Sequence, residues 1–208
     1  MSDRDRLLRS LRRNGIRDPR VLAAIERVPR ELFVPERHRV RAYDDAAVPL
    51  GHGATVSQPT MVARMCEELA LRGDERVLDV GTGSGYGAAV LAELGAHVVG
   101  IELVPELAEG ARAALARAGY DVEVVVGDGS LGLPDRGPFD AICVAAAAPA
   151  PPPALVAQLA PGGRLAVPVG RGEQRLEIVT ATPDGPVVAR SVPCRFVPLV
   201  GAEGFAPP

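Results

Sequence analysis

From residue 59 onward, short apolar runs alternate with longer segments of helical periodicity. The runs are bounded by glycine, proline or acidic residues, as is typical of strands buried on both faces of a parallel sheet. We expect strands at 76–80, 97–102, 122–128, 139–146 and 163–170, and helices at 59–72, up to Leu94, from Pro105 and at 153–160. This alternation predicts an α/β, Rossmann-like, doubly wound and mainly parallel sheet with helices on both faces.

The carboxyl-terminal part departs from this alternation. Between residues 175 and 199, two strand-like runs flank the tetrapeptide PDGP, and no helical segment separates them. That tetrapeptide is a turn signal. We therefore expect an antiparallel hairpin at one end of the sheet.

The amino-terminal part carries helix signals of its own. Ser2 or Asp3 can cap a first helix, and Asp18 followed by Pro19 is a typical start for a second. Residues 31–59 then show no sustained period. Because so long a loop is uncommon in a compact domain unless it has a function, we expect it to contribute to a site.

Length and charge limit the classes of protein. The 208 residues, 47% of them hydrophobic, suffice for one core. We expect one compact domain, with N-terminal helices and a substrate loop in residues 1–58 and the core with its carboxyl-terminal strands in 59–208. A net charge of -3, from 23 basic and 26 acidic residues, argues against a nucleic acid partner.

Cys66, Cys143 and Cys194 lie far apart among apolar neighbours. Such cysteines are typical of a reducing compartment, and they form neither a disulfide pattern nor a metal site. No amino-terminal stretch suits a signal peptide, and no run of about eighteen apolar residues would span a bilayer. We expect a cytoplasmic monomer with no metal and no membrane partner.

The segment DVGTGSGYG, which begins at Asp79, follows the first predicted strand. Gly81, Gly83 and Gly85 allow positive φ and a close approach of the backbone to a ligand. Gly83, Gly85 and Ala88 also fit the dinucleotide fingerprint, but Asp79 would repel a pyrophosphate. A ligand with an ammonium group would be attracted to Asp79.

Acidic residues lie at or next to the carboxyl ends of three successive predicted strands: Asp79, Glu102 and Asp128. In a doubly wound sheet, ligands bind beyond the carboxyl ends of the strands. S-adenosylmethionine offers an amino group to Asp79, ribose hydroxyls to Glu102 and an adenine edge to Asp128. Each acid alone could be a helix cap or a solvated carboxylate, but the three together predict this cofactor.

Longer motifs resemble one family. VLDVGTGSGYGAAVLAEL, GDGSLGLPDRGPFDAICVAAAAP, LAPGGRLAVPVG and RFVPLVG are similar, in this order and spacing, to protein-L-isoaspartate O-methyltransferases. RVPRELFVPE and AYDDAAVPLGHGATVSQPTMVARM match the segment that this family has before its first strand. The similarity extends from about residue 12 to 201, and VSQP joined to RVPRELFVP is its most specific part.

The resemblance implies methyl transfer from S-adenosylmethionine to the free α-carboxyl of an L-isoaspartyl residue in a damaged protein or peptide. The ester then cyclises to a succinimide, which opens partly to aspartate. Because that carboxyl is already ionised at neutral pH, no general base is needed, and we expect His52 to be a loop residue. Ser57 is implied as the catalytic residue beside the reacting carboxylate, and it could also cap the helix at Pro59.

Two sets of binding residues follow from the resemblance and the strand ends. The cofactor set is Asp79, Gly81, Thr82, Gly83, Ser84, Gly85, Glu102, Leu103, Asp128 and Gly129. The substrate set is Thr55, Val56, Gln58, Pro59, Arg195, Phe196 and Val197, of which the last three would hold the peptide through main-chain contacts. Ala54, Gly87 and Ala145 stand where bacterial members frequently have glutamine, glutamine and threonine, which leaves substrate preference open.

Other functions stay open beside protein repair. A relative of the same fold could methylate a normal aspartate in one biosynthetic peptide and form an aspartimide; the end of this chain soon after the last family motif favours repair. A non-catalytic nucleotide-binding module or a nicotinamide-dependent reductase would be another class, but the VSQP segment argues against the first and Asp79 against the second. VAAAAP replaces the NPPY or DPPY of enzymes that methylate nucleic acid amino groups.

Overall fold

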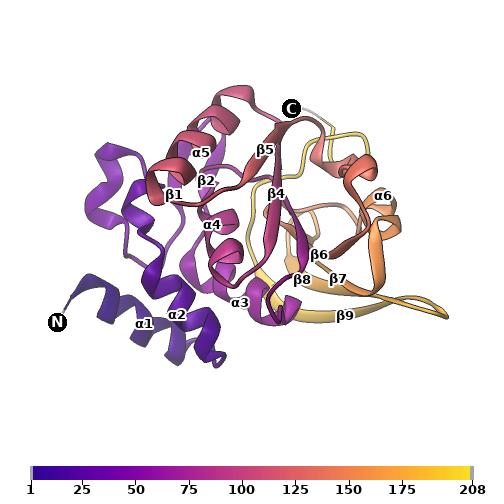
Figure 1. Cartoon of the computed structure of the whole chain (residues 1–208), viewed down its shortest axis with the longest axis horizontal. Helices are drawn as coiled ribbons and strands as arrows, with labels where there is room; N and C mark the ends of the chain where they lie inside the picture. The colour runs from indigo at the N-terminus through magenta and orange to yellow at the C-terminus, as the bar shows by residue number, and fades with distance from the viewer. Residues whose placement is uncertain (1, 207–208) are drawn as a thin grey trace.

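The computed structural model describes residues 2–206 of the chain. They form a seven-stranded sheet of order β5-β4-β3-β6-β7-β8-β9 (Figure 1). The strands are β3 (Arg76–Val80), β4 (His97–Glu102), β5 (Glu123–Val126), β6 (Phe139–Val144), β7 (Leu159–Val169), β8 (Gln174–Thr182) and β9 (Gly185–Cys194). Strands β3 to β7 pair in parallel, whereas β8 and β9 are antiparallel. The predicted fold class and the carboxyl-terminal hairpin are confirmed.

Both faces of the sheet are buried, as the continuous apolar runs predict. In β3, Val77 packs into the cluster on one face and Leu78 into the cluster on the other. The first face is covered by α3 (Pro59–Leu69), α4 (Tyr86–Glu93) and α5 (Pro105–Ala118). The second face is covered by α6 (Pro153–Ala157), by chain near the 3-10 turns η3 (Gly129–Leu131) and η4 (Pro134–Arg136), and by the segment after β9.

Two helices end earlier than the sequence predicts. α3 stops at Leu69 because its C-cap, Ala70, adopts a left-handed φ of 49°. α6 has only five residues, and the chain enters β7 at Leu159, which pairs with Phe139 of β6. At the end of α6, pairing of the chain with β6 therefore replaces the last helical turn that local periodicity predicts.

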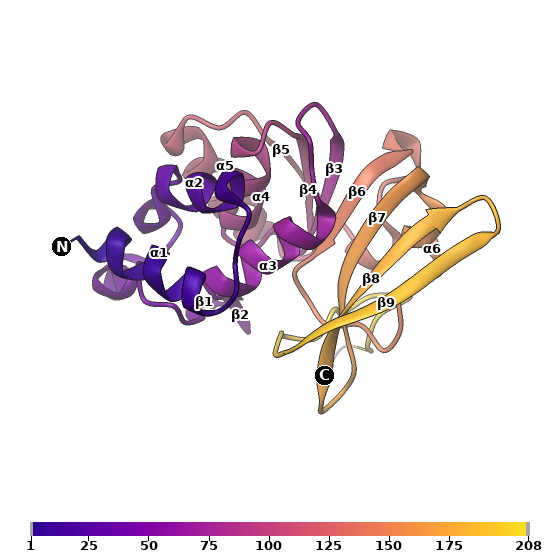
Figure 2. The same ribbon diagram turned by 90° about the horizontal axis from the view of Figure 1, so that it is seen from below.

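Two helices precede the core, α1 (Asp3–Arg13) and α2 (Pro19–Arg27). Ser2 caps α1 in a capping box with Asp5, and the Asp18 carboxylate caps α2 by accepting a backbone N–H at 2.8 Å. The predicted starts of both helices are confirmed. Figure 2 shows α1 and α2 at one end of the molecule and the β8–β9 hairpin at the other.

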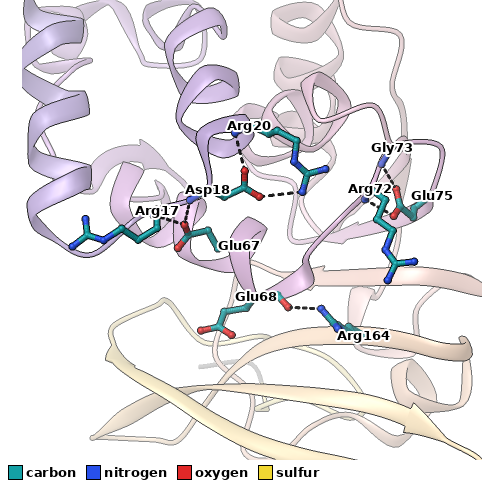
Figure 3. Close-up of polar contacts among 9 residues, drawn as sticks. All are labelled: Arg17, Asp18, Arg20, Glu67, Glu68, Arg72, Gly73, Glu75 and Arg164. Atoms are coloured by element: carbon teal, nitrogen blue, oxygen red, sulfur yellow. Dashed lines mark hydrogen bonds and ion pairs between the residues drawn. The ribbon is translucent and has the colours of Figure 1, made fainter.

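Glu67 of α3 joins these helices to the core (Figure 3). Its carboxylate accepts the backbone N–H groups of Arg17 and Asp18 at 2.5 and 2.6 Å, directly before α2 begins. A negative charge at the amino-terminal end of a helix is favoured by the helix dipole. Apolar side chains of α1 and α2 also share one buried cluster with those of α3 and α4. The division at residue 58 stays a prediction.

The segment between α2 and α3 contains the 3-10 helices η1 (Arg30–Leu32) and η2 (Glu36–Arg41). A small hairpin of β1 (Val48–Gly51) and β2 (Ala54–Val56) follows. Both strands are short, with four residues in β1 and three in β2. Within residues 2–206, no helix combines the length and the apolar character needed to cross a membrane.

Strand order reverses beside β3. The chain passes from β3 through β4 to β5 on one side of the sheet, and then returns to place β6 on the other side of β3. The loops after β3 and β6 therefore lead away from each other and leave room at the carboxyl edge of the sheet.

Candidate active site

A cavity of about 420 Å³ lies at this edge. The β1–β2 hairpin with the residue after it, the turn after β3, and the chain after β9 line it together with the ends of β4 and β6. Segments far apart in the sequence therefore meet in one wall. The predicted site residues on the wall are Thr55, Val56, Ser57, Asp79, Gly81, Thr82, Gly83, Ser84, Glu102, Leu103, Gly129 and Val197.

The turn after β3 brings the main chain close to the cavity. Gly81 and Gly83 lie on the wall with φ of 75° and 56°, which glycine adopts without a steric penalty from Cβ. Gly85 lies behind the wall, and a Cβ there would be 3.0 Å from Cγ of Leu115. Gly85 therefore permits close packing of α4 on α5, whereas Gly81 and Gly83 face the ligand space.

The Glu102 carboxylate fixes the end of β4 to the glycine turn. One oxygen accepts the N–H of Gly83 at 2.8 Å, and the other accepts the N–H of Val104 at 3.0 Å. The residue is buried, and each oxygen keeps a further lone pair for a ligand. Two adjacent hydroxyl groups of a ribose would suit this pair of acceptors.

Asp79 brings a buried carboxylate with an open hydrogen-bonding position. Its side chain is 2% exposed, and Oδ2 has no hydrogen-bond partner in the described part of the chain. Burial raises the pKa of Asp79 to about 7; the Thr82 hydroxyl opposes this rise, and the charge of Glu102 adds to it. A cationic ligand group would relieve both the missing hydrogen bond and the repulsion. The ammonium-bearing ligand predicted from the sequence therefore fits this wall.

The Ser57 hydroxyl faces the cavity without a structural task. The residue directly follows β2, and α3 begins two positions later with Gln58 as an N-cap whose side chain makes no capping bond. Ser57 makes no hydrogen bond through its hydroxyl to any residue in 2–206. Its alternative role as a helix cap is therefore not present, and the hydroxyl is free to donate to a ligand.

Asp128 lies outside the wall, where it holds the carboxyl-terminal segment. Its carboxylate accepts the N–H and hydroxyl of Ser130 at 2.9 and 2.7 Å and the N–H of Ala202 at 2.7 Å. Burial would raise the pKa of Asp128, but these hydrogen bonds outweigh burial and lower it. Its contact with an adenine stays a prediction. The other predicted residues outside the wall are Gln58, Pro59, Gly85, Arg195 and Phe196.

The floor of the cavity, which was not predicted from the sequence, includes Met65, Cys66, Tyr86 and Cys143. Burial raises the pKa of Cys66 and of Tyr86 to about 12 and that of Cys143 well above its usual value, so all three groups are neutral at pH 7. The helical spacing of Met65 and Cys66 with Val62 does mark a buried face of α3. Periodicity alone does not distinguish a face covered by protein from one that a ligand covers.

Comparison with known proteins decides the family. The family model described as protein-L-isoaspartate(D-aspartate) O-methyltransferase matches residues 2–204. The chain belongs to this family. The protein-L-isoaspartate O-methyltransferase 2 of Marinobacter nauticus is 56% identical to it over 195 residues, which are 92% of this chain and 89% of that protein. The protein-L-isoaspartate O-methyltransferase of Aeropyrum pernix is 52% identical over 208 residues, 96% of this chain and 80% of that protein.

A solved structure from Plasmodium falciparum, described as a protein-L-isoaspartate O-methyltransferase in complex with S-adenosyl-L-homocysteine, has the same fold. It superimposes with a TM-score of 0.84 at 28% sequence identity and covers 96% of this chain and 99% of its own. The family resemblance seen in the motifs is thus confirmed. The positions that depart from the bacterial pattern, Ala54, Gly87 and Ala145, all line the cavity of this chain.

Proposed function

We propose that this chain is a protein-repair enzyme in which Ser57 orients the free α-carboxylate of an L-isoaspartyl residue for methylation by S-adenosylmethionine. The observation that carries this assignment is one cavity that joins an unpartnered Ser57 hydroxyl to two buried carboxylates, Asp79 and Glu102. The hydroxyl suits an anionic substrate, and the carboxylates suit a cationic cofactor.

S-adenosylmethionine supplies an electrophilic methyl group when it is bound. We assign its amino group to Asp79, its ribose to Glu102, and its close main-chain contacts to Gly81 and Gly83. Oδ2 of the buried Asp79 carboxylate has no hydrogen-bond partner in the described residues, and the ammonium group of the cofactor would provide one together with an ion pair. Both residues have a positive φ, which favours glycine, and because glycine has no side chain the wall stays open at that point.

The substrate carboxylate needs orientation rather than deprotonation. A carboxyl group with an ordinary pKa near 3.5 to 4 is ionised at neutral pH, so the protein has no proton to remove. Ser57 donates a hydrogen bond to one oxygen and thereby directs the other toward the methyl group. Thr55 and Val56, on the same wall, help to exclude water around the reacting atoms.

The thiols on the floor do not compete with the substrate for the methyl group. A thiolate is the reactive form of cysteine, but burial keeps Cys66 and Cys143 protonated at neutral pH. Neither thiol is therefore a competing nucleophile in the cavity.

The peptide would be held beside the segment of Arg195, Phe196 and Val197. The side-chain amide of Gln174 already bonds both main-chain groups of Phe196, at 2.6 and 3.1 Å, which fixes this segment against β8. Because these bonds use the N–H and C=O of Phe196, the peptide contacts would fall to the neighbouring main-chain groups, which are the same for peptides of many sequences. We further propose that the enzyme acts as a monomer on isoaspartyl proteins. We place it in the cytoplasm because free thiols such as its three cysteines are typical of a reducing compartment.

Two synthetic peptides that differ only in L-isoaspartate or L-aspartate at one position test this function. After incubation with S-adenosylmethionine, mass spectrometry should show methylation and then succinimide from the isoaspartyl peptide alone. Methylation of the aspartyl peptide instead would favour the aspartimide-forming alternative. Cofactor binding without methylation of either peptide would refute the repair assignment.

Ser57→Ala tests the role of the hydroxyl, with Ser57→Thr as the matched control that keeps it. A hydrogen bond to a charged group contributes roughly 1.5–3 kcal/mol, so kcat/KM for the isoaspartyl peptide should fall about 10- to 100-fold in the alanine variant. The affinity for S-adenosylhomocysteine should stay constant. Equal activity of the alanine variant and the wild type would remove Ser57 from the reaction.

A further inference from the structure

A second and larger hollow adjoins the active-site cavity. This groove has a volume of about 960 Å³ and is formed by the turn between β7 and β8, the end of β9 and the segment that follows β9. Its positively charged residues are Arg171, Arg175 and Arg195, and its aromatic residues are Phe196 and Phe205. Glu173 also lies on the wall.

The groove is a local concentration of positive charge on an acidic chain. It has three arginines against one carboxylate, a balance of +2, whereas the whole chain has a net charge of -3. All three arginines are exposed, and in residues 2–206 none of them forms an ion pair. Their charge is therefore available to a ligand.

Two of the three arginine side chains contact uncharged groups, which orient the guanidinium but do not neutralise its positive charge. Nη2 of Arg175 donates to the carbonyl oxygen of Ser191 at 2.9 Å, which directs the guanidinium along the end of β9. The guanidinium carbon of Arg171 lies 4.7 Å from the centroid of the Phe205 ring. A guanidinium held in this way keeps donors free for a carboxylate, which it can bind in bidentate geometry.

The groove shares part of its wall with the active-site cavity. Pro198 and Val200 line both the groove and the cavity that contains Ser57 and Asp79. The chain from Arg195 to Val200 therefore leads from one hollow directly to the other. A polypeptide with its isoaspartyl residue beside Ser57 would have to leave the cavity, and the groove gives its flanking residues an open path.

We infer that the groove binds acidic residues that flank the isoaspartyl residue in the same polypeptide, so that the enzyme prefers damaged sites in acidic sequence. This inference rests on the proposed function. The arginines would contact the flanking carboxylates, while the aromatic rings and Pro193 would pack against the peptide chain. The reacting residue itself would contact the same groups in every substrate.

A set of isoaspartyl peptides of equal length tests this preference. The flanking positions carry serine, glutamate or lysine, on the amino-terminal side in one series and on the carboxyl-terminal side in another. Exposed ion pairs are individually weak, and two of them would change kcat/KM roughly fivefold. In one of the two series, we expect kcat/KM for the glutamate peptide to exceed that for the serine peptide by about this factor. The kcat/KM for the lysine peptide should be lower than that for the serine peptide. Both differences should become smaller in high salt.

Arg171→Glu locates the preference, with Arg13→Glu as the matched control. Both substitutions change the net charge equally, but Arg13 is exposed on α1, which lies at the opposite end of the molecule from β8 and β9 (Figure 2). The ratio of kcat/KM for the glutamate and serine peptides should fall to one or below in Arg171→Glu. It should keep its wild-type value in Arg13→Glu.

The outcomes separate the two proposals. Equal use of acidic, neutral and basic peptides by the wild type overturns the groove inference and leaves the repair function intact. An equal loss of the ratio in both variants would show a general charge effect, which also overturns the inference. Failure of the wild type to methylate even the serine-flanked isoaspartyl peptide would instead refute the proposed function.

Discussion

The guanidinium carbon of Arg30 lies 4.5 Å from the centroid of the Tyr86 ring, and neither side chain is accessible to water beyond 2%. Nε of Arg30 donates to the carbonyl oxygen of Ala42 at 2.7 Å, and Nη2 donates to that of Ala46 at 3.4 Å. The arginine therefore connects the loop before the β1–β2 hairpin to the first residue of α4. That hairpin carries the residues that lead to Ser57, and α4 follows the glycine turn.

Arg30→Met should destabilise the protein and weaken peptide binding. The carbonyl oxygen of Ala42 would lose its donor in a buried position and that of Ala46 in a part-buried one, which should lower the free energy of unfolding by about 2 kcal/mol. Because the loop precedes the hairpin, KM for the peptide should rise more than the dissociation constant of S-adenosylhomocysteine. Urea unfolding and steady-state kinetics measure both effects.

Tyr86→Phe is the control for this pair. It keeps the ring under the guanidinium and removes a buried hydroxyl that has no hydrogen-bond partner in the described residues. The free energy of unfolding should change by less than about 0.5 kcal/mol, or should increase. A loss as large as that of Arg30→Met would mean that the hydroxyl has a partner and that the ring alone does not support the arginine.

Asp79→Asn should stabilise the unliganded protein and weaken cofactor binding. Because the folded protein raises the pKa of Asp79 from 3.8 to about 7, the contribution of this group to stability is fully present below pH 3.8 and is lost as pH rises through about 7. At pH 8 the variant should therefore be more stable by up to about 4 kcal/mol, while S-adenosylhomocysteine binds at least about tenfold more weakly. Thermal unfolding at pH 5 and pH 8, with calorimetric titration, tests both. An unchanged pH dependence in the variant would contradict this account.

Glu102→Gln should shift the pH dependence of cofactor binding to lower pH. The charge of Glu102 contributes to the raised pKa of Asp79, so its removal lets Asp79 ionise earlier. The pH at which S-adenosylhomocysteine affinity begins to rise should then decrease, although the affinity itself is lower because one acceptor is lost. Glu109→Gln, an exposed position on α5, is the control and should keep the wild-type profile. A parallel profile in Glu102→Gln would show that the two carboxylates do not interact.

Gly85→Ala and Gly83→Ala, two substitutions in the glycine turn, should affect protein stability and cofactor binding to different degrees. At Gly85, with φ of 88°, the new Cβ would meet Cγ of Leu115 at 3.0 Å, so the free energy of unfolding should fall by about 1–3 kcal/mol. At Gly83 the nearest atoms lie 3.7 Å away, so the cost is mainly that of φ, about 1–2 kcal/mol, and the methyl group enters the ligand wall. Gly83→Ala should therefore lose more S-adenosylhomocysteine affinity, and Gly85→Ala more stability. Urea unfolding and calorimetry distinguish the two, and identical effects would contradict the assignment.

The sequence by itself determined the features that depend on neighbours along the chain. Ser2 and Asp18 cap their helices through bonds to residues two or three positions away, and β3 and β4 match the predicted apolar runs from end to end. The acid near the end of β3 and the glycine turn also led to predicted cofactor-binding residues, of which Asp79, Gly81 and Gly83 line the cavity. Each of these signals is complete within a few residues, so no tertiary contact is needed to interpret it.

Tertiary structure decided the features that depend on hydrogen bonds and burial between residues far apart in the sequence. Asp128 has the spacing of a ligand-binding acid, and its carboxylate also accepts the N–H of Ala202, which lies 74 positions away and which no local pattern predicts. Arginine is a residue type that usually lies on the surface, but Arg30 is completely buried beneath the carbonyl groups of the following loop and the ring of Tyr86. The groove beside the active site joins residues from three segments, and the spacing of its arginines predicts nothing until β8 and β9 pair. Hydrogen bonds and burial between remote residues depend on the folded geometry, and local periodicity carries no information about them.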